Sequence, residues 1–447
     1  MLSAILVNVL IGMGDLTGAG CLSSDCRGVR TLGPVVVGLG VIAVVTALGR
    51  LLGPVFVSPA IGSWLVTTPV DRAALLRPRV LVAMALVAAT TGLVSAGAAT
   101  LAGWSLAGGV LLAGATGLLG LGVFGLAVRV QGAPRGSTPR TVGLRGPGAV
   151  AWLLLLVLAL GLGSRVAAPD PDARWYVALA ACGLLALLGT TWAVRAVPLL
   201  HRRDVVRGAG LVPAVSGALA TLDLSLAWDV VSEHRWRDHP AVRSRRGRWS
   251  GTGALVWADL ARLRRSPGRV LRLAAAGVLP YAVQAAGAGR VVILVVALVG
   301  FLAGLPLLTG LRVLERSPGL VRLLPFTTRN ARLAAMVVPV VGLVGFGLAM
   351  TPALPPGEGR PLLGLACGLV AAAAAVRWMT GRPPDYARPL VSTPAGGVPT
   401  NLYGSALRGF DVVLLGTAPL LLSPTPDGAL VSVAVSAVVL AYLLGRD

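Results

Sequence analysis

WLVTTPVDRAALLRPR, residues 64–79, lies between two long apolar runs and ends in arginine. A similar stretch, LVRLLPFTTRNAR, returns at residues 320–332. Their prolines, Pro69 and Pro325, are 256 residues apart (325 − 69). In each stretch an arginine follows the proline within about one helical turn, and a new apolar run then begins. This pattern indicates two copies of one unit, unless arginine-rich loops between apolar runs are similar by chance.

A shorter match supports the duplication. Ser-Thr-Pro occurs at residues 137–139 and again at 392–394, an offset of 255 residues (392 − 137). Apolar runs also follow one another in the same order on both sides of the middle of the chain. We therefore expect a first half at 1–197 and a second half at 270–447, joined by a cytoplasmic linker at 198–269.

The composition excludes an ordinary soluble domain. Of the 447 residues, 55% are hydrophobic and only 13% are charged, with a mean hydropathy of +0.82. Many apolar runs approach the roughly 20 residues that a helix needs to cross a bilayer. The sequence therefore predicts an all-α polytopic membrane protein.

We expect about twelve transmembrane helices, six in each half. An even number in each half predicts that the two halves have parallel rather than inverted topology. The first run has no basic region before it and is interpreted as a retained span, not a cleaved signal. The expected spans are 1–13, 33–57, 80–103, 106–128, 148–167, 176–197, 270–286, 291–310, 332–351, 361–379, 406–422 and 428–445.

The net charge is +22, and because the chain contains no lysine, all 39 basic residues are arginine. These arginines concentrate in alternate loops, chiefly 129–145, 198–269 and 312–329. The positive-inside rule explains this distribution more simply than nucleic-acid binding does. We expect a multi-pass protein of the cell (plasma) membrane with both termini in the cytoplasm, in contact with lipid and not with nucleic acid.

The linker is the only long polar stretch. Residues 217–231 are compatible with a helix that carries Asp229. Residues 253–265, GALVWADLARLRR, predict an amphipathic helix with Asp259, Arg262 and Arg265 on its wet side, ended by Ser-Pro-Gly. This helix either lies along the inner membrane surface or is a solvated charged helix.

The cysteines and histidines leave open whether the chain contains a disulfide or a metal site. Cys21 and Cys26 share a short polar loop, CLSSDC, and are bridged if the loop is extracytoplasmic and oxidised, or free if it is not. Cys182 and Cys367 lie in apolar runs, where packing explains them. The three histidines all lie in the linker, at spacings that favour solvated loop residues over a metal site. We therefore assign no metal to the chain.

No catalytic motif is evident. A Walker A loop needs a lysine, which this chain cannot supply, so no nucleotide or other cofactor is expected in it and the chain is not expected to be an enzyme. Asp411 is the only acidic residue in the assigned spans, beside Arg408. Such scarcity of buried acids counts against coupling to protons or sodium.

The two repeated stretches, residues 64–79 and 320–332, are the strongest remaining functional signal. Their prolines can occupy the first turn of a helix. In the first stretch Leu75 and Leu76 can face one way, while Arg72 and Arg79 face another. Each stretch is either a short amphipathic helix that partners can push, tilting the adjoining spans, or a tight cytoplasmic turn with the usual positive charge.

Here the sequence resembles the permease subunits of ABC exporters. In that family a coupling helix between the second and third spans commonly reads P-[VF]-x-R-x-x-L, as residues 69–75 do here. Residues 325–329, Pro-Phe-Thr-Thr-Arg, are a looser copy with the arginine one place later. Residues 257–262 look like the family's connecting helix. Nothing comparable precedes the first span, so either the chain begins upstream of Met1 or the first half lacks this helix.

The resemblance implies an exporter permease fold and a separate ABC-type ATPase, in two copies, that binds ATP and Mg²⁺. The transported substrate is not specified beyond a hydrophobic or amphipathic class. The rival functions are a secondary, non-ATP transporter with internal repeats and a membrane scaffold. The residues that would dock the ATPase are Pro69, Asp71, Arg72, Leu75, Arg77, Arg79, Arg322, Pro325, Phe326, Arg329 and Arg332.

Overall fold

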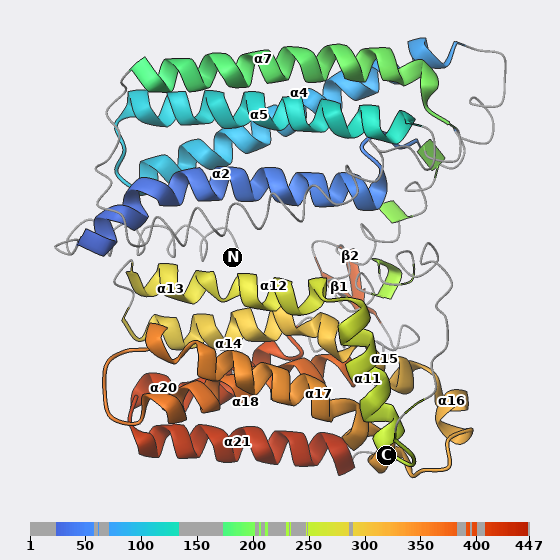
Figure 1. Ribbon diagram of the computed structural model, residues 1–447, viewed down its shortest axis with the longest axis vertical. Coiled ribbons are helices and arrows are strands. Elements are labelled where there is room, and N and C mark those ends of the chain that lie inside the picture. Colours follow the sequence, from blue (N-terminus) through green and yellow to red (C-terminus); the bar gives the residue numbers. More distant parts are fainter. Residues whose placement is uncertain are drawn as a thin grey trace. The chain divides into compact units, whose positions relative to one another are not determined.

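The chain divides into two compact units, Met1–Gly217 with Val230–Arg235 and Ala218–Asp229 with Trp236–Asp447. Each unit is mainly a bundle of helices (Figure 1). The computed structural model describes residues 24–57, 61, 71–133, 173–201, 205–206, 211–212, 229–231, 233, 247, 249–285, 289–381, 390–393, 396–399 and 407–445.

The described part of the first unit contains four long helices, followed by the short 3-10 helix η1 (Val197–Leu199). Within this unit α2 packs against both α4 and α5, α4 packs against α5, and α5 packs against α7. The four helices are α2 (Ser24–Leu52), α4 (Arg72–Leu101), α5 (Leu106–Gly132) and α7 (Ala173–Ala196).

Glycines bring the backbones of α5 and α7 together. A Cβ placed at Gly125 would collide with the backbone of Gly189, and one placed at Gly122 would lie 2.8 Å from the carbonyl oxygen of Leu185. Small residues allow membrane helices to approach this closely, where dispersion forces replace the hydrophobic effect as the source of association.

In the second unit α18 lies at the centre. Helix α18 packs against α14, α17, α20 and α21, and its residues 370–376 are fully inaccessible to solvent. Edge-to-face contacts among Phe301, Trp378 and Phe410 extend the core. The remaining elements of this unit are α11 (Gly253–Arg265), α12 (Gly268–Ala276), α13 (Val278–Ala285), α14 (Val291–Gly304), η2 (Leu305–Leu308), α15 (Thr309–Arg316), α16 (Pro318–Arg322), α17 (Thr328–Ala349), η3 (Thr351–Ala353), α18 (Arg360–Met379), α20 (Phe410–Leu422) and α21 (Pro426–Gly445).

One short hairpin departs from the all-α prediction. Strands β1 (Leu390–Thr393) and β2 (Gly396–Pro399) pair antiparallel, with Leu390 opposite Pro399 and Thr393 opposite Gly396. The second Ser-Thr-Pro landmark begins in β1, and its counterpart at 137–139 lies outside the described residues.

The described part of the chain contains seven helices long and apolar enough to cross a membrane. Two shorter apolar helices, Gly33–Gly49 and Phe410–Leu422, also coincide with expected spans. This content indicates a membrane-embedded helical protein. The seven candidate spans are Ala73–Leu101, Leu106–Gly132, Trp175–Leu199, Val291–Arg316, Thr328–Ala349, Arg360–Met379 and Pro426–Gly445.

Three span predictions need correction. The helix expected at 33–57 begins nine residues earlier, at Ser24, and ends at Leu52 (33 − 24). The span expected at 270–286 is divided at Gly277 into α12 and α13. The span expected at 291–310 continues through η2 and α15 to Arg316. Expected spans 1–13 and 148–167 lie outside the described residues.

Two pairs of helices, with one member in each unit, begin at a similar offset in the sequence. Helices α4 and α17 start 256 residues apart, at Arg72 and Thr328 (328 − 72). The starts of α5 and α18, at Leu106 and Arg360, are 254 residues apart (360 − 106). In the second unit α14 packs against α17 and α18, α17 packs against α18, and α18 packs against α21. The first unit has the same order of contacts: α2 packs against α4 and α5, α4 packs against α5, and α5 packs against α7.

Candidate functional site

The first predicted docking segment, residues 64–79, forms the start of α4 in its described part. Asp71 is the N-cap, and its Oδ1 accepts a 2.8 Å hydrogen bond from the backbone N–H of Ala73. This bond satisfies one of the backbone donors that a helix start leaves without an intrahelical partner. The predicted separate short helix is therefore continuous with the following span, because α4 runs on through Pro78 to Leu101.

Helix α4 buries one side of its first turns. Ala73, Leu76 and Val80 belong to an apolar cluster that also contains Val128 of α5. Arg77 and Arg79 are exposed, whereas Leu75 is half-buried. The predicted division of Leu75 and Leu76 from Arg72 and Arg79 stays a prediction, because the side chain of Arg72 lies outside the described residues.

The second predicted docking segment, residues 320–332, contains the end of α16, a turn and the start of α17. Thr327 is the N-cap of α17, and its Oγ1 accepts a 3.3 Å hydrogen bond from the backbone N–H of Asn330. Pro325 and Arg329 are exposed, and Phe326 is half-buried. Both segments therefore place a capping residue two positions after the proline.

Arg332 differs from the other arginines of the second segment because it faces Glu315 of α15. Its Nε donates to Glu315 Oε1 at 2.5 Å and its Nη2 donates to Oε2 at 3.1 Å. The two side chains are only 14% and 15% exposed. This two-bond geometry is the strong form of an arginine–carboxylate pair, and it ties α17 to α15.

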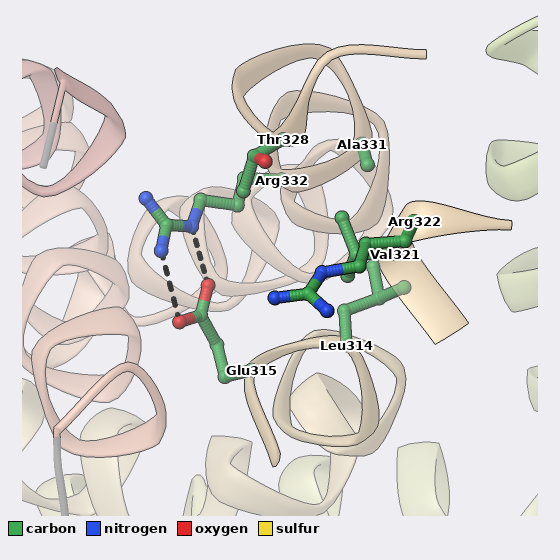
Figure 2. A pocket seen from close by; sticks show the side chains of 7 residues that line it. All are labelled: Leu314, Glu315, Val321, Arg322, Thr328, Ala331 and Arg332. Atoms are coloured by element: carbon green, nitrogen blue, oxygen red, sulfur yellow. Dashed lines mark hydrogen bonds and ion pairs between the residues drawn. The ribbon is translucent and has the colours of Figure 1, made fainter. Parts of the chain in front are cut away.

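A pocket of about 200 Å³ lies beside this ion pair, between α15, α16 and the first turn of α17 (Figure 2). The guanidinium group of Arg322 extends into it toward the pair. Leu314, Val321 and Ala331 form its apolar walls, and Thr328 lines it as well.

A second ionic group holds α15 from another direction. Asp229, from the linker, accepts hydrogen bonds from Nε and Nη2 of Arg312, the latter at 2.6 Å. Arg316 Nη2 lies 3.0 Å from the same carboxylate. The side chain of Arg312 is 7% exposed, so this pair is a nearly buried charge contact. Removing one member of such a pair leaves an uncompensated charge.

A third ionic pair lies within α11, next to Gly310 of α15, and corrects a sequence prediction. Asp259 does not lie on the wet side of α11, because it is buried and accepts a 2.6 Å hydrogen bond from Arg262. A Cβ at Gly310 would lie 2.5 Å from this carboxylate, so the absence of a side chain there makes room for the pair. Burial raises the pKa of the Asp259 carboxyl, while the positive charge of Arg262 acts in the opposite direction.

Arg269 contacts the long span Val291–Arg316 where its regular helix is interrupted, at η2. Its Nη1 donates to Thr309 Oγ1 at 2.8 Å and to the carbonyl oxygen of Pro306 at 3.2 Å. Pro306 lies in η2, where the proline interrupts the regular helix between α14 and α15. Arg269 thus partners a carbonyl group beside the interruption.

Asp411 pairs with Arg377, which is distant in the sequence, and not with its sequence neighbour Arg408. Its Oδ2 accepts from Nη2 of Arg377 at 3.2 Å, joining α20 to the last turn of α18. Arg408 packs against Gly381, where a Cβ would lie 2.6 Å from its Nη1. Both partners of the Asp411 pair are about one-third exposed or more, so this contact lies toward solvent.

Several predicted residues lie outside the described part of the chain. Pro69, Cys21, His234 and His239 are among them, and so is the side chain of Arg72. The backbone of Cys26 belongs to α2, so this cysteine is helical and not in the polar loop that the sequence suggested. The Cys21–Cys26 bridge remains a prediction.

Sequence reasoning missed the ionic contacts of α15. It treated Arg312 and Arg316 as loop residues, because charge lowers the hydropathy after residue 310. The stretch TGLRVLER nevertheless places Leu311 and Leu314 at helical spacing, with charged residues between them. That amphipathic pattern was the available signal that the helix continues.

The helices and their apolar spans define a multi-pass helical membrane protein. A family model, described as Family of unknown function (DUF6297), matches residues 26–389. The chain belongs to this family. No curated protein and no solved structure matches the chain.

Proposed function

We propose that the chain is the permease subunit of an ATP-driven exporter in the cell membrane, with both termini in the cytoplasm. Two copies of a separate ABC-type ATPase would bind ATP and Mg²⁺ and dock one on each half. The chain itself would hydrolyse no ATP and hold no cofactor. Its twelve spans would form two parallel six-helix repeats around a path for a hydrophobic or amphipathic substrate.

The observation that carries this proposal is the repeated start of α4 and α17. The two helices begin 256 residues apart, each after a proline and an N-cap, and each has arginine in its first turn. Arg77 in one segment and Arg329 in the other are exposed, as a docking surface requires. A single tight turn with positive charge would not need this repetition.

The packing order provides further support. The same pairs of corresponding helices are neighbours in both units, as expected for a duplicated permease. Helix α11 occupies the place of the exporter family's connecting helix, directly before α12. It packs against α17, the helix that begins in the second segment.

The continuity of α4 suggests how docking would move the membrane part. Its first turn and its apolar span are one uninterrupted helix from Arg72 to Leu101. A force at the first turn would therefore tilt the span as a rigid body. Closure of an ATPase pair on ATP would move both segments and switch the side to which the central path opens.

The test is co-purification of the chain from its native membrane, followed by measurement of ATP hydrolysis in lipid. The variant is Arg72→Glu combined with Arg329→Glu, since charge reversal adds repulsion as well as removing attraction. The control is Arg264→Glu, which reverses an exposed arginine of α11 outside both segments. We expect the double variant to insert and fold, yet to lose the ATPase or its transport-linked hydrolysis.

The outcomes separate the rival functions. An intact complex with normal turnover in the double variant would reject docking through these segments. A wild-type chain that transports substrate and brings no ATPase would be a secondary transporter. A chain that binds partners without stimulated ATP hydrolysis would be a scaffold.

A further inference from the structure

The pocket beside the Glu315–Arg332 pair lies where two candidate membrane spans meet the edge of the apolar region. The span Val291–Arg316 ends beside it, and the span Thr328–Ala349 begins beside it. The short helix α16 connects these two ends. A pocket built from the ends of adjacent spans lies at the depth of lipid headgroups.

The pocket has one cation in excess. Glu315 accepts two hydrogen bonds from Arg332, so these two charges compensate each other. Arg322 also reaches into the pocket (Figure 2), and within the described part of the chain no ion pair or hydrogen bond involves its side chain. A guanidinium group in this position matches the geometry of a phosphate oxygen pair.

Apolar surface adjoins the cation. Leu323, which directly follows Arg322, is 83% exposed, and Leu320 is 42% exposed. Leu314 and Val321 continue this apolar character inside the pocket. In water such leucines would be poorly placed, whereas at a membrane interface they can contact acyl chains.

We propose that this pocket binds the phosphate group of an anionic lipid, with Arg322 as its charged ligand and the leucines of α16 against the acyl chains. Phosphate is the shared chemistry of a lipid headgroup and a free anion. The adjoining exposed leucines and the position at two span ends favour the lipid. Arg322 also belongs to the second predicted docking segment, but Arg329 of that segment lies outside the lining of the pocket, so lipid binding and ATPase docking can be tested apart.

The experiment measures binding of fluorescent phosphatidylglycerol to the purified full chain in detergent micelles, with empty micelles as background. Unlabelled phosphatidylglycerol, phosphatidylcholine and inorganic phosphate serve as competitors. The variant is Arg322→Gln, and Arg329→Gln is the matched control, an exposed arginine of the same segment that does not line the pocket. Arg322→Lys retains the charge without the planar fork.

We expect Arg322→Gln to raise Kd for phosphatidylglycerol about tenfold, as the loss of one charge-assisted contact implies. Arg329→Gln should change Kd less than about twofold, since an exposed charge contributes little. Arg322→Lys should lie between wild type and Arg322→Gln. Leu323→Gln should weaken binding of the lipid and leave binding of soluble glycerol phosphate unchanged. Phosphatidylglycerol should displace the probe, and phosphatidylcholine should not.

Three results would overturn the proposal. Equal affinities of Arg322→Gln and wild type, in samples with the same elution volume and melting temperature, would remove Arg322 from any phosphate site. Equal loss in both glutamine variants would mean a diffuse charge effect. Displacement by millimolar inorganic phosphate alone would assign the pocket to the free anion and reject the lipid. The result is independent of whether an ATPase co-purifies.

Discussion

The two predicted docking segments begin their spans in the same way but rest on different supports. In the first, residues 64–79, the start of α4 packs through Ala73 and Leu76 into an apolar cluster. In the second, residues 320–332, Arg332 of α17 is held by Glu315 of α15. Helix α15 is in turn held by Asp229 of the linker.

This difference shows that similar sequence motifs can have unequal sensitivity. Apolar contacts are spread over many atoms, so the described support of the first segment does not depend on one charge. Ionic contacts concentrate the support of the second segment in a few groups, and removal of one leaves its partner uncompensated. We therefore expect the second segment to be the one that single charge changes disturb.

The largest expected effect on stability follows Asp229→Ala. This change leaves Arg312, whose side chain is 7% exposed, without its carboxylate, and we expect a loss of about 3 kcal/mol. Thermal unfolding in detergent measures it. Asp427→Ala is the control, because Asp427 is an exposed acid at the start of α21 and its loss should have little effect. Equal melting temperatures of the two variants would contradict an ionic support.

A smaller effect is expected from the Glu315–Arg332 pair. Glu315→Ala and Arg332→Ala should each cost about 2 kcal/mol, because each leaves a largely buried charge. The double variant should lose less than the sum, with a coupling free energy of about 1 kcal/mol or more. Strictly additive losses would show that the two residues act independently, and the contrast between the segments would then rest on Asp229 alone.

Loss of the N-cap should destabilise the two segments equally. Asp71→Ala and Thr327→Ala each remove a side-chain acceptor from a helix start, and each should cost about 1 kcal/mol. Asp71→Asn and Thr327→Ser are conservative controls that retain an acceptor. A large cost at one cap and none at the other would mean that the two helix starts are not equivalent.

The smallest effect on stability is expected from Arg72→Glu and Arg329→Glu made singly, within about 0.5 kcal/mol. Their effect on ATPase retention should be unequal. Residues 69–75 match the exporter motif more closely than residues 325–329 do, so Arg72→Glu should release more ATPase. Greater release by Arg329→Glu would reverse the proposed ranking of the segments.

Hydropathy predicted most spans because apolar runs of about 20 residues have few alternatives in a membrane. It also gave the bounds of α11, 253–265, since Ser266, Pro267 and Gly268 end a helical pattern. It could not give the burial of Asp259 or the partners of Asp229 and Glu315. Those contacts depend on which helices pack together, and a charged residue looks solvated until its partner is known.

The glycine contacts between α5 and α7 have a mechanical consequence. A carbonyl of one helix fills the hollow left by a missing side chain on the other, as at Gly125 and Gly189. Sliding the pair by one residue would bring a bulky neighbour into that hollow, so the two helices are locked in register. The two helices therefore form one rigid pair, and in any motion within the first unit α5 and α7 must move together.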